Sequence, residues 1–415
     1  MTQLATVSIG TNGINQQHGT PDTIILMPPY TLYGWKLSYF TGKLYSYLKC
    51  KNIPFVENNV NIYTLYSKVK KNTGAVVMPT LTTPEGEWLQ DTRNIINILE
   101  KRFPDSPSVF PTTPKRLFVS NLFEAWGDEM WISTAMHYRW NYPESVEQFK
   151  REAGDSLLPF APRMLKNHFA NKTATTLIQY LPYVGVTPDQ FPILEKWTVD
   201  MLSKLDVHFK DNRYLLGNDQ PTIGDFGMMG PLYAHLSRDP WPRDHLMNEY
   251  PHLKAWIDRM LQSGDATDVS PDNGEGVGGG DEIPPTLVPI LRLIFNEFTP
   301  MAERTLEQLN KLLAEWPEGK ILRRTLYRDV PIQFPMGDAL FSRPCNPHLL
   351  YKVQGVLDGY RQGSYDDQVS VEKWVEALGG KNMLSLDIPR LERVALQVRV
   401  VGQGDDRGRK KTTEE

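Results

Sequence analysis

The segment from Val76 to Pro104, VVMPTLTTPEGEWLQDTRNIINILEKRFP, constrains the fold of this 415-residue chain more than any other. Two short runs with strand character flank a Pro-Glu-Gly turn, and apolar residues at helical spacing follow them. Thr92 stands just before the apolar run, so we expect a helix to begin there. A helix start offers free backbone N–H groups and the positive end of the dipole, and both suit a ligand carboxylate.

The Met78–Pro79 step comes immediately before the first of these strands. An X–Pro peptide bond adopts the cis form at modest cost. A cis bond here would turn the N–H and C=O groups of Met78 outward, where an extended peptide can pair with them. The segment therefore predicts a peptide-pairing strand beside a helix start that binds an anion.

The composition is that of a globular protein and excludes several functional classes. The chain is 40% hydrophobic and carries a net charge of −4, which gives no indication of a nucleic acid or an anionic membrane as partner. Its apolar runs are far shorter than the roughly 18 residues that span a bilayer, and no signal peptide is evident. Because Cys50 and Cys345 are its only cysteines, we expect no disulfide framework and a cytoplasmic protein.

A second group of residues, N-terminal to the first, carries a family resemblance. Thr31–Trp35 predicts a strand, and the run from Ser38 to Lys43 leads into a predicted helix that ends before Ile53. This S-Y-F-T-G-K entry, V-M-P-T-L, the Gly turn and the D-T pair together resemble the thioredoxin-like domain of cytosolic glutathione transferases. The usual motifs there are S-P-[FY]-x-x-[KR], V-P-x-L and E/D-S/T. The short spacing from Ser38 to Ile53 resembles the Ser- and Cys-type classes more than the Tyr-type classes.

Past a proline-rich linker, apolar residues recur at helical spacing and predict an all-helical region. We expect helices at 117–140, 144–154, 158–180, 190–210, 224–236 and 250–262. Thr222 and Asp225 form an S/T-x-x-D capping box, which resembles the start of the buried helix of transferase α domains. We interpret this box as a folding signal and not as a catalytic pair.

The resemblance implies an α/β plus all-α fold in which a thioredoxin-like domain precedes an all-helical glutathione-transferase C-terminal domain. A C-terminal α+β extension follows, which most members lack. We expect in it one or two helices at 284–316, a hairpin within 320–340, two helices within 346–379 and a strand at 391–401. The predicted segments are a disordered tail at 1–22, a thioredoxin-like glutathione-binding domain at 23–104, the α domain at 114–262, an acidic Gly-rich loop at 263–283, the extension at 284–401 and a disordered tail at 402–415.

The resemblance also implies a glutathione site. Met78, shaped by Pro79 and next to Val77, would pair through its backbone with the cysteinyl residue of glutathione. Asp91 would bind the γ-glutamyl ammonium and Thr92 its carboxylate, although a simple helix cap would also explain this pair. The group that holds the glycyl carboxylate stays open among Lys68, Lys70, Lys71 and Asn72.

Ser38 is the predicted catalytic residue and also contacts glutathione. Its hydroxyl would donate a hydrogen bond to the sulfur at the start of a helix, where the dipole also favours the thiolate. A shift of one pKa unit corresponds to about 1.4 kcal/mol, so a hydroxyl and a dipole together ionise much of a thiol. The alternative is that Ser38 only caps the helix, and Tyr39 stands where the family usually has proline.

The aromatic phrase MHYRWNYP at 136–143 supplies the predicted pocket for the second substrate. We expect Tyr138, Arg139 and Trp140 to line an acceptor pocket between the domains, with Arg139 steadying negative charge. The alternative is that aromatic residues at helical spacing belong to the core. His137 is more typical of a structural histidine than of a base.

The sequence predicts a glutathione transferase that joins the glutathione thiolate to a small hydrophobic electrophile. Glutathione would be its co-substrate, no metal would be needed, and the family's usual homodimer would form. One alternative is a non-catalytic protein of the same fold that uses the extension for interactions. Another is a glutathione-dependent lyase, isomerase or ether-cleaving enzyme.

Overall fold

The structure is a computed structural model that describes residues 29–217, 220–262, 280–315 and 319–401. The predicted tails at 1–22 and 402–415 lie outside the described residues, as does most of the predicted loop at 263–283.

The N-terminal part is a four-stranded mixed sheet in the order β2-β1-β3-β4. Strands β1 and β2 are parallel, so the chain crosses between them through helix α1, whereas β3 pairs antiparallel with both β1 and β4. The elements are β1 Tyr30–Gly34, α1 Tyr39–Cys50, β2 Phe55–Asn59, α2 Ile62–Thr64, the π-helix η1 Leu65–Lys70, α3 Lys71–Thr73, β3 Thr80–Thr82, β4 Trp88–Gln90 and α4 Thr92–Arg102.

An all-helical region follows, and its central helix α5 packs against α10. The predicted helix at 117–140 is wrong as a single element, because the chain divides it into α5 and α6. Trp131 lies at the break, where it is fully buried against the rings of Trp126 and Trp197, so packing decides the break. The helices are α5 Pro114–Glu129, α6 Ile132–Trp140, α7 Pro143–Leu157, α8 Arg163–Ile178, α9 Phe191–Asp211, α10 Ile223–Pro231, α11 Pro240–His245 and α12 Pro251–Met260.

The predicted capping box at the start of α10 is confirmed. The Asp225 carboxylate accepts a hydrogen bond from the Thr222 backbone N–H at 2.8 Å. It also accepts from the Leu215 N–H at 2.9 Å and from the Trp256 indole at 3.1 Å. All four residues are buried, so the carboxylate organises the interior of the helical region and takes no part in a site.

In its described residues, the extension contains one long α-helix, two hairpins and three shorter α-helices. The predicted single strand at 391–401 is wrong, because the chain reverses at Ala395, whose φ is +54°, and forms the hairpin β7–β8. The elements are α13 Val288–Leu313, β5 Ile332–Met336, β6 Ala339–Arg343, α14 His348–Arg361, α15 Tyr365–Ala377, α16 Lys381–Leu384, β7 Leu391–Val394 and β8 Gln397–Val400.

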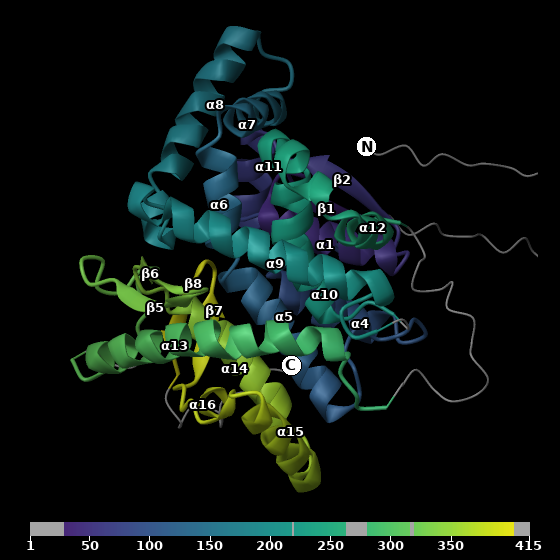
Figure 1. The fold of residues 1–415 in the computed structure, drawn as a ribbon. Helices are drawn as coiled ribbons and strands as arrows, with labels where there is room; N and C mark the ends of the chain where they lie inside the picture. Colours follow the sequence, from purple (N-terminus) through teal and green to yellow (C-terminus); the bar gives the residue numbers. More distant parts are fainter. Residues whose placement is uncertain (1–28, 218–219, 263–279, 316–318, 402–415) are drawn as a thin grey trace, which may run out of the picture.

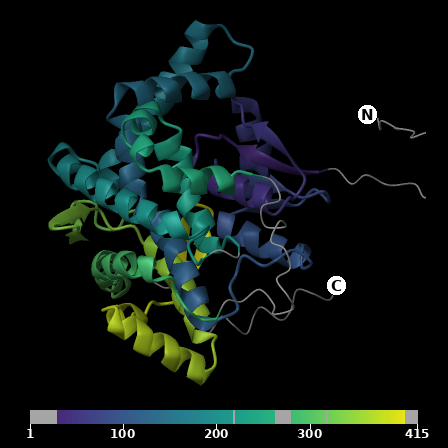
Figure 2. The same ribbon diagram turned by 45° about the vertical axis from the view of Figure 1, so that its right-hand side comes forward.

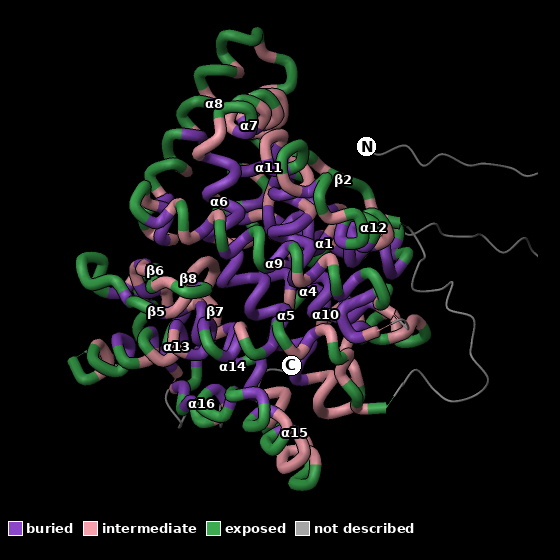
Figure 3. Tube along the Cα trace, in the orientation of Figure 1, coloured by how far each residue is buried: buried purple, intermediate pink, exposed green. Residues whose placement is uncertain are grey.

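The extension packs onto the rest of the molecule along α5. Helices α14 and α15 contact α5, and α14 also contacts β7 and β8. In two views, α7 and α8 extend from one end of the molecule and the extension lies at the other end (Figure 1, Figure 2). Buried residues run through the centre, where α5 meets α10 and α14 (Figure 3).

A buried ionic network joins the extension to the two other regions. The Lys43 ammonium lies 2.7 Å from the Glu124 carboxylate and 2.8 Å from Asp128, which also accepts from Lys352 at 2.8 Å. Arg93 pairs with the second oxygen of Glu124. Burial by itself would raise the pKa of Glu124, but the nearby cations, chiefly Arg93 and Lys43, hold it at about 2. The network therefore ties α1, α4, α5 and α14 together by charge.

Candidate functional site

A cavity of about 140 Å³ lies where α1, α4 and the segment before β3 meet the extension. Five of the predicted glutathione-binding residues line it together: Val77, Met78, Pro79, Asp91 and Thr92. Phe40 near the start of α1 lines it too. The structure thus places the predicted peptide-pairing segment and the predicted anion-binding helix start in one cavity.

Met78 presents unpaired backbone groups at this cavity. The Met78–Pro79 peptide bond is cis. Neither the N–H nor the C=O of Met78 has a hydrogen-bond partner within the described part of the chain. Both groups are therefore available to an extended ligand, whereas Val77 is buried and its carbonyl accepts from the Thr80 hydroxyl at 3.4 Å.

Asp91 stands at the N-cap of α4 and is 7% exposed. One of its carboxylate oxygens accepts from the backbone N–H groups of Arg93 and Asn94, at 2.9 and 3.2 Å, so it caps the helix. The other oxygen pairs with the guanidinium of Arg393, which the hairpin β7–β8 brings to it. The carboxylate predicted to receive an ammonium is thus already paired with a cation of the extension.

Arg393 divides two hollows on this side of the molecule. Together with Asp91, it lines both the cavity and a neighbouring hollow of about 380 Å³ beside Asn94 and Tyr351. Burial lowers the pKa of Arg393 to about 10, which leaves it charged at neutral pH. The first cavity is smaller than the roughly 300 to 1,000 Å³ that ligand pockets usually enclose, and the Asp91–Arg393 ion pair lines both it and the larger neighbouring hollow.

Ser38 occupies the N-cap of α1, and its side chain makes no capping hydrogen bond. Its backbone N–H donates to Trp35 and its carbonyl accepts from Gly42, so the main chain is held and the hydroxyl is left over. Ser38 is not among the residues that line the cavity, whereas Phe40 is. Tyr39 points away from the cavity, because its hydroxyl donates to the buried carbonyl of Gly127 and burial raises its pKa well above the usual value.

The three residues predicted to form an acceptor pocket lie in the interior instead. Tyr138, Arg139 and Trp140 are 1%, 4% and 6% exposed. The Arg139 guanidinium pairs with the Asp239 carboxylate at 2.9 Å and donates to the Ala234 carbonyl at 2.8 Å, so its charge is neutralised inside the protein. The prediction is corrected, because all three side chains are buried in the interior, which is what the alternative interpretation expected of the aromatic residues.

His137 has the structural role that the sequence favoured. Its Nε2 lies 3.1 Å from the Glu195 carboxylate, and its side chain is 1% exposed. Burial lowers the pKa of His137, so the ring stays neutral.

The extension supplies cavity residues that sequence reasoning missed: Arg324, Asn346, His348, Lys352, Arg393 and Leu396. Arg324 lies 5.0 Å from the ring centre of Tyr180, and it has no carboxylate partner among the described residues. No local motif marks these positions, since each side chain reaches the cavity only through the packing of the extension against α5.

His348 is the one imidazole in the cavity wall among the described residues. Its Nδ1 lies 2.7 Å from the carboxylate of Glu129, which is the last residue of α5 and is also in the wall. The Glu129 side chain is 3% exposed and that of His348 is 19% exposed. The pair therefore sits with the carboxylate inside and the ring toward the cavity.

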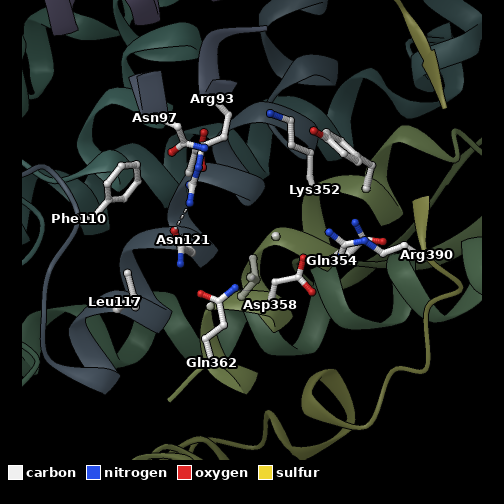
Figure 4. Close-up of a pocket in the computed structure, with 15 residues that line it drawn as sticks. Arg93, Asn97, Phe110, Leu117, Asn121, Lys352, Gln354, Asp358, Gln362 and Arg390 are labelled. Carbon is white, nitrogen blue, oxygen red and sulfur yellow. Dashed lines mark hydrogen bonds and ion pairs between the residues drawn. The ribbon is translucent and has the colours of Figure 1, made fainter. Parts of the chain in front are cut away.

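A third hollow, of about 380 Å³, lies along the interface between α4, α5 and α14. In Figure 4, the side chain of Arg93 extends toward Asn121, to which it donates at 2.9 Å, and Arg390 lies on the α14 side. Arg390 pairs with Asp358 at 2.6 Å. Arg93 pairs with Glu124 of the same walls and Lys352 with Asp128 behind them, so we assign no ligand to this hollow.

Comparison with known families assigns the class of protein. Residues 32–107 match the family described as Glutathione S-transferase, N-terminal domain, and residues 198–259 match Glutathione S-transferase, C-terminal domain. The chain thus carries matches to both domains of the glutathione transferase family, and the predicted fold class is confirmed. These matches do not distinguish the Ser-type subgroup from the others. A search of curated proteins finds no match.

Several solved structures resemble the chain at low identity. A glutathione S-transferase from Pseudomonas fluorescens is 20% identical over 56% of this chain and 94% of that chain, with a TM-score of 0.32. The β-etherase LigF from Sphingobium sp. strain SYK-6 is 18% identical over 58% and 98%, with a TM-score of 0.37. A glutathione S-transferase from Methylobacterium radiotolerans, in complex with glutathione sulfonate, is 16% identical over 61% and 100%, with a TM-score of 0.35. At these values the likenesses add nothing about ligand or reaction.

Two features, a metal-holding cluster of side chains and a helix able to cross a membrane, are absent from the described residues. Within the described ranges, no three or more His, Cys, Asp or Glu side chains are grouped so that they can hold a metal ion. No helix in that part of the chain combines the length and the apolar character that crossing a membrane requires.

Proposed function

We propose that this protein is a cytoplasmic glutathione transferase that joins the thiolate of glutathione to a small hydrophobic electrophile. The observation that carries the proposal is the meeting of Met78, Asp91 and Thr92 in one cavity. One segment of the chain thus offers a backbone pairing site and a helix N-terminus side by side, as the two ends of a γ-glutamyl peptide require.

In this proposal, the cysteinyl residue of glutathione pairs with the free N–H and C=O of Met78. The γ-glutamyl carboxylate binds at Thr92, where the first N–H groups of α4 point outward. The ammonium approaches Asp91 and shares this carboxylate with Arg393. The sulfur then lies near the start of α1, where the unused Ser38 hydroxyl donates a hydrogen bond to it.

The electrophile enters beside the sulfur, between Phe40, Ile132 and Leu396, which give the cavity its apolar walls. These residues take the place of Tyr138, Arg139 and Trp140 in our assignment of the acceptor site. Holding the thiolate and the electrophile in contact supplies most of the rate, since proximity and an ionised nucleophile both lower the barrier.

The test is glutathione binding by calorimetry with the wild type, Asp91→Ala and Thr92→Val. We expect micromolar to low-millimolar affinity in the wild type and a loss of at least about tenfold in each variant, as befits a hydrogen bond to a charged group. Asp105→Ala is the matched control, because Asp105 is exposed and remote from the cavity. Absence of binding to the wild type would favour a non-catalytic role for the fold.

The predicted homodimer remains a prediction. The family usually forms dimers, yet α14 and α15 of the extension already cover part of α5. Sedimentation that shows a single species of about 47.5 kDa at high protein concentration would contradict the dimer.

A further inference from the structure

The hydrogen bond between His348 and Glu129 fixes the tautomer of the imidazole. A carboxylate accepts hydrogen bonds and does not donate them, so Nδ1 of His348 carries the hydrogen that bridges the 2.7 Å to Glu129. Nε2 then keeps its lone pair. Within the described residues Nε2 has no hydrogen-bond partner, while the ring lines the cavity that Met78 and Thr92 also line. A base held by a carboxylate, with its second nitrogen free, is the arrangement that activates a thiol.

Arg343 of the extension contacts Glu129 at groups other than the oxygen that binds His348. The guanidinium of Arg343 donates to the Glu129 backbone carbonyl at 3.0 Å and lies 3.8 Å from its second carboxylate oxygen. Arg343 is 4% exposed, so the carboxylate has little freedom to turn away from the imidazole. Glu129 is therefore a rigid support for His348.

Cations outnumber carboxylates by one in the wall of this cavity. Arg324 lines the cavity, and Lys352, which follows on α14, pairs with Asp128 behind the wall. Arg393 and Asp91 form the ion pair at the far end. The wall thus carries three cations, Arg324, Lys352 and Arg393, against the two carboxylates Asp91 and Glu129, and this balance favours an anion over a neutral thiol.

We infer that His348 accepts the thiol proton of glutathione and that Glu129 is the positioning residue that holds it. This inference rests on the proposed function and deepens it, because it assigns the proton acceptor of the same site. The Ser38 hydroxyl keeps a complementary role, since an alcohol donates a hydrogen bond to a thiolate but does not take up the thiol proton at neutral pH.

The step balances without a further reactant. The S–H bond breaks and its proton forms an N–H bond at Nε2 of His348, which gives a thiolate and an imidazolium beside the Glu129 carboxylate. The thiolate then forms a C–S bond with the electrophilic carbon while the bond to the leaving group breaks with its electron pair. The imidazolium returns its proton to the leaving group, and His348 is neutral again.

The experiment measures the ultraviolet absorbance of the thiolate of bound glutathione as a function of pH. We choose His348→Asn, because the asparagine amide can still donate to Glu129 while the Nε2 acceptor is removed. We expect the thiolate midpoint to rise by about one pH unit or more, which is about tenfold less thiolate, with glutathione affinity within about threefold of the wild type. His252→Gln, at an exposed histidine, should leave the midpoint unchanged.

A second variant and a measurement on the wild type complete the test. Glu129→Gln should raise the midpoint less than His348→Asn, since the base remains but its support is weakened. Nitrogen NMR of histidine-labelled wild type should report Nε2 protonation when glutathione binds, and it requires no variant to fold. Glutathione binding with an unchanged midpoint in His348→Asn, or an Nε2 that stays unprotonated, would overturn the inference alone. A wild type that binds no glutathione would overturn the proposed function and the inference together.

Discussion

The thioredoxin-like region and the C-terminal extension form opposite walls of one cavity, but they contribute different chemistry. The first region offers backbone groups, at Met78 and at the start of α4, which in our proposal bind a peptide by its main chain and its carboxylate. The extension offers side chains, above all His348 and Arg393. Backbone groups suit a ligand that many proteins share, whereas side chains can change without disturbing a sheet, so we expect the extension to set the reaction.

The first test of this comparison weakens the contact between the extension and α5. Lys352→Met leaves the buried Asp128 with Lys43 as its one cation in the described network. Removing one partner of a buried ion pair typically costs about 3 to 5 kcal/mol, and we expect a loss of this size in urea unfolding. Lys373→Met, at an exposed position of α15, should change stability by less than about 0.5 kcal/mol. A loss of unfolding free energy below about 1 kcal/mol for Lys352→Met would mean that this ion pair does not hold the extension against α5.

Acid should weaken the buried ionic network at α5 by protonating the Glu124 carboxylate. Its folded pKa of about 2 lies below the ordinary value of 4.5, so its contribution to stability is complete above about pH 4.5. It is lost as the pH falls from there toward 2, by about 3 kcal/mol in total. Unfolding free energies between pH 2 and 7 should therefore fall more steeply for the wild type than for Glu124→Gln. Equal slopes for the two proteins would contradict this assignment.

The Asp91–Arg393 pair tests the contact between the two walls directly. A double-mutant cycle with Asp91→Ala and Arg393→Ala should give a coupling energy of about 1.5 to 3 kcal/mol, typical of a hydrogen-bonded charged group that is largely buried. Arg399→Ala serves as the control, because its pair with Glu392 joins two strands of one surface hairpin and should contribute about 0 to 1 kcal/mol. Additive effects at Asp91 and Arg393 would show that the two walls do not depend on each other there.

The smallest effect concerns the acceptor. Leu396→Ala should raise the KM for a hydrophobic electrophile about five- to tenfold, because it removes apolar surface from the cavity at about 1 kcal/mol or somewhat more. Trp140→Phe should leave that KM within about twofold, since Trp140 is buried in the helical region. The reverse pattern in steady-state kinetics would restore Trp140 as part of the wall of the acceptor site.

The sequence alone determined the features whose cause is local. The cap at Asp91, the strand start after Met78–Pro79 and the Thr222–Asp225 box each depend on a few neighbouring residues. Turn and cap chemistry acts over that range, so the elements and the family resemblance were predictable from the chain. The cavity residues of the thioredoxin-like region could be singled out for the same reason, because one continuous segment carries most of them, and their binding of glutathione stays a prediction.

Only the tertiary structure decided what long-range packing controls. Helical spacing identified an aromatic stripe at Tyr138 but not which face it turned inward, and nothing local marked the break beside Trp131. Arg393 reaches Asp91 across 302 residues of sequence, and His348 reaches Glu129 across 219. Such contacts depend on how whole helices pack against α5. That packing results from many weak apolar contacts and a few buried charges. No short motif predicts this packing. The cavity residues that the extension supplies could therefore be identified only from the folded structure.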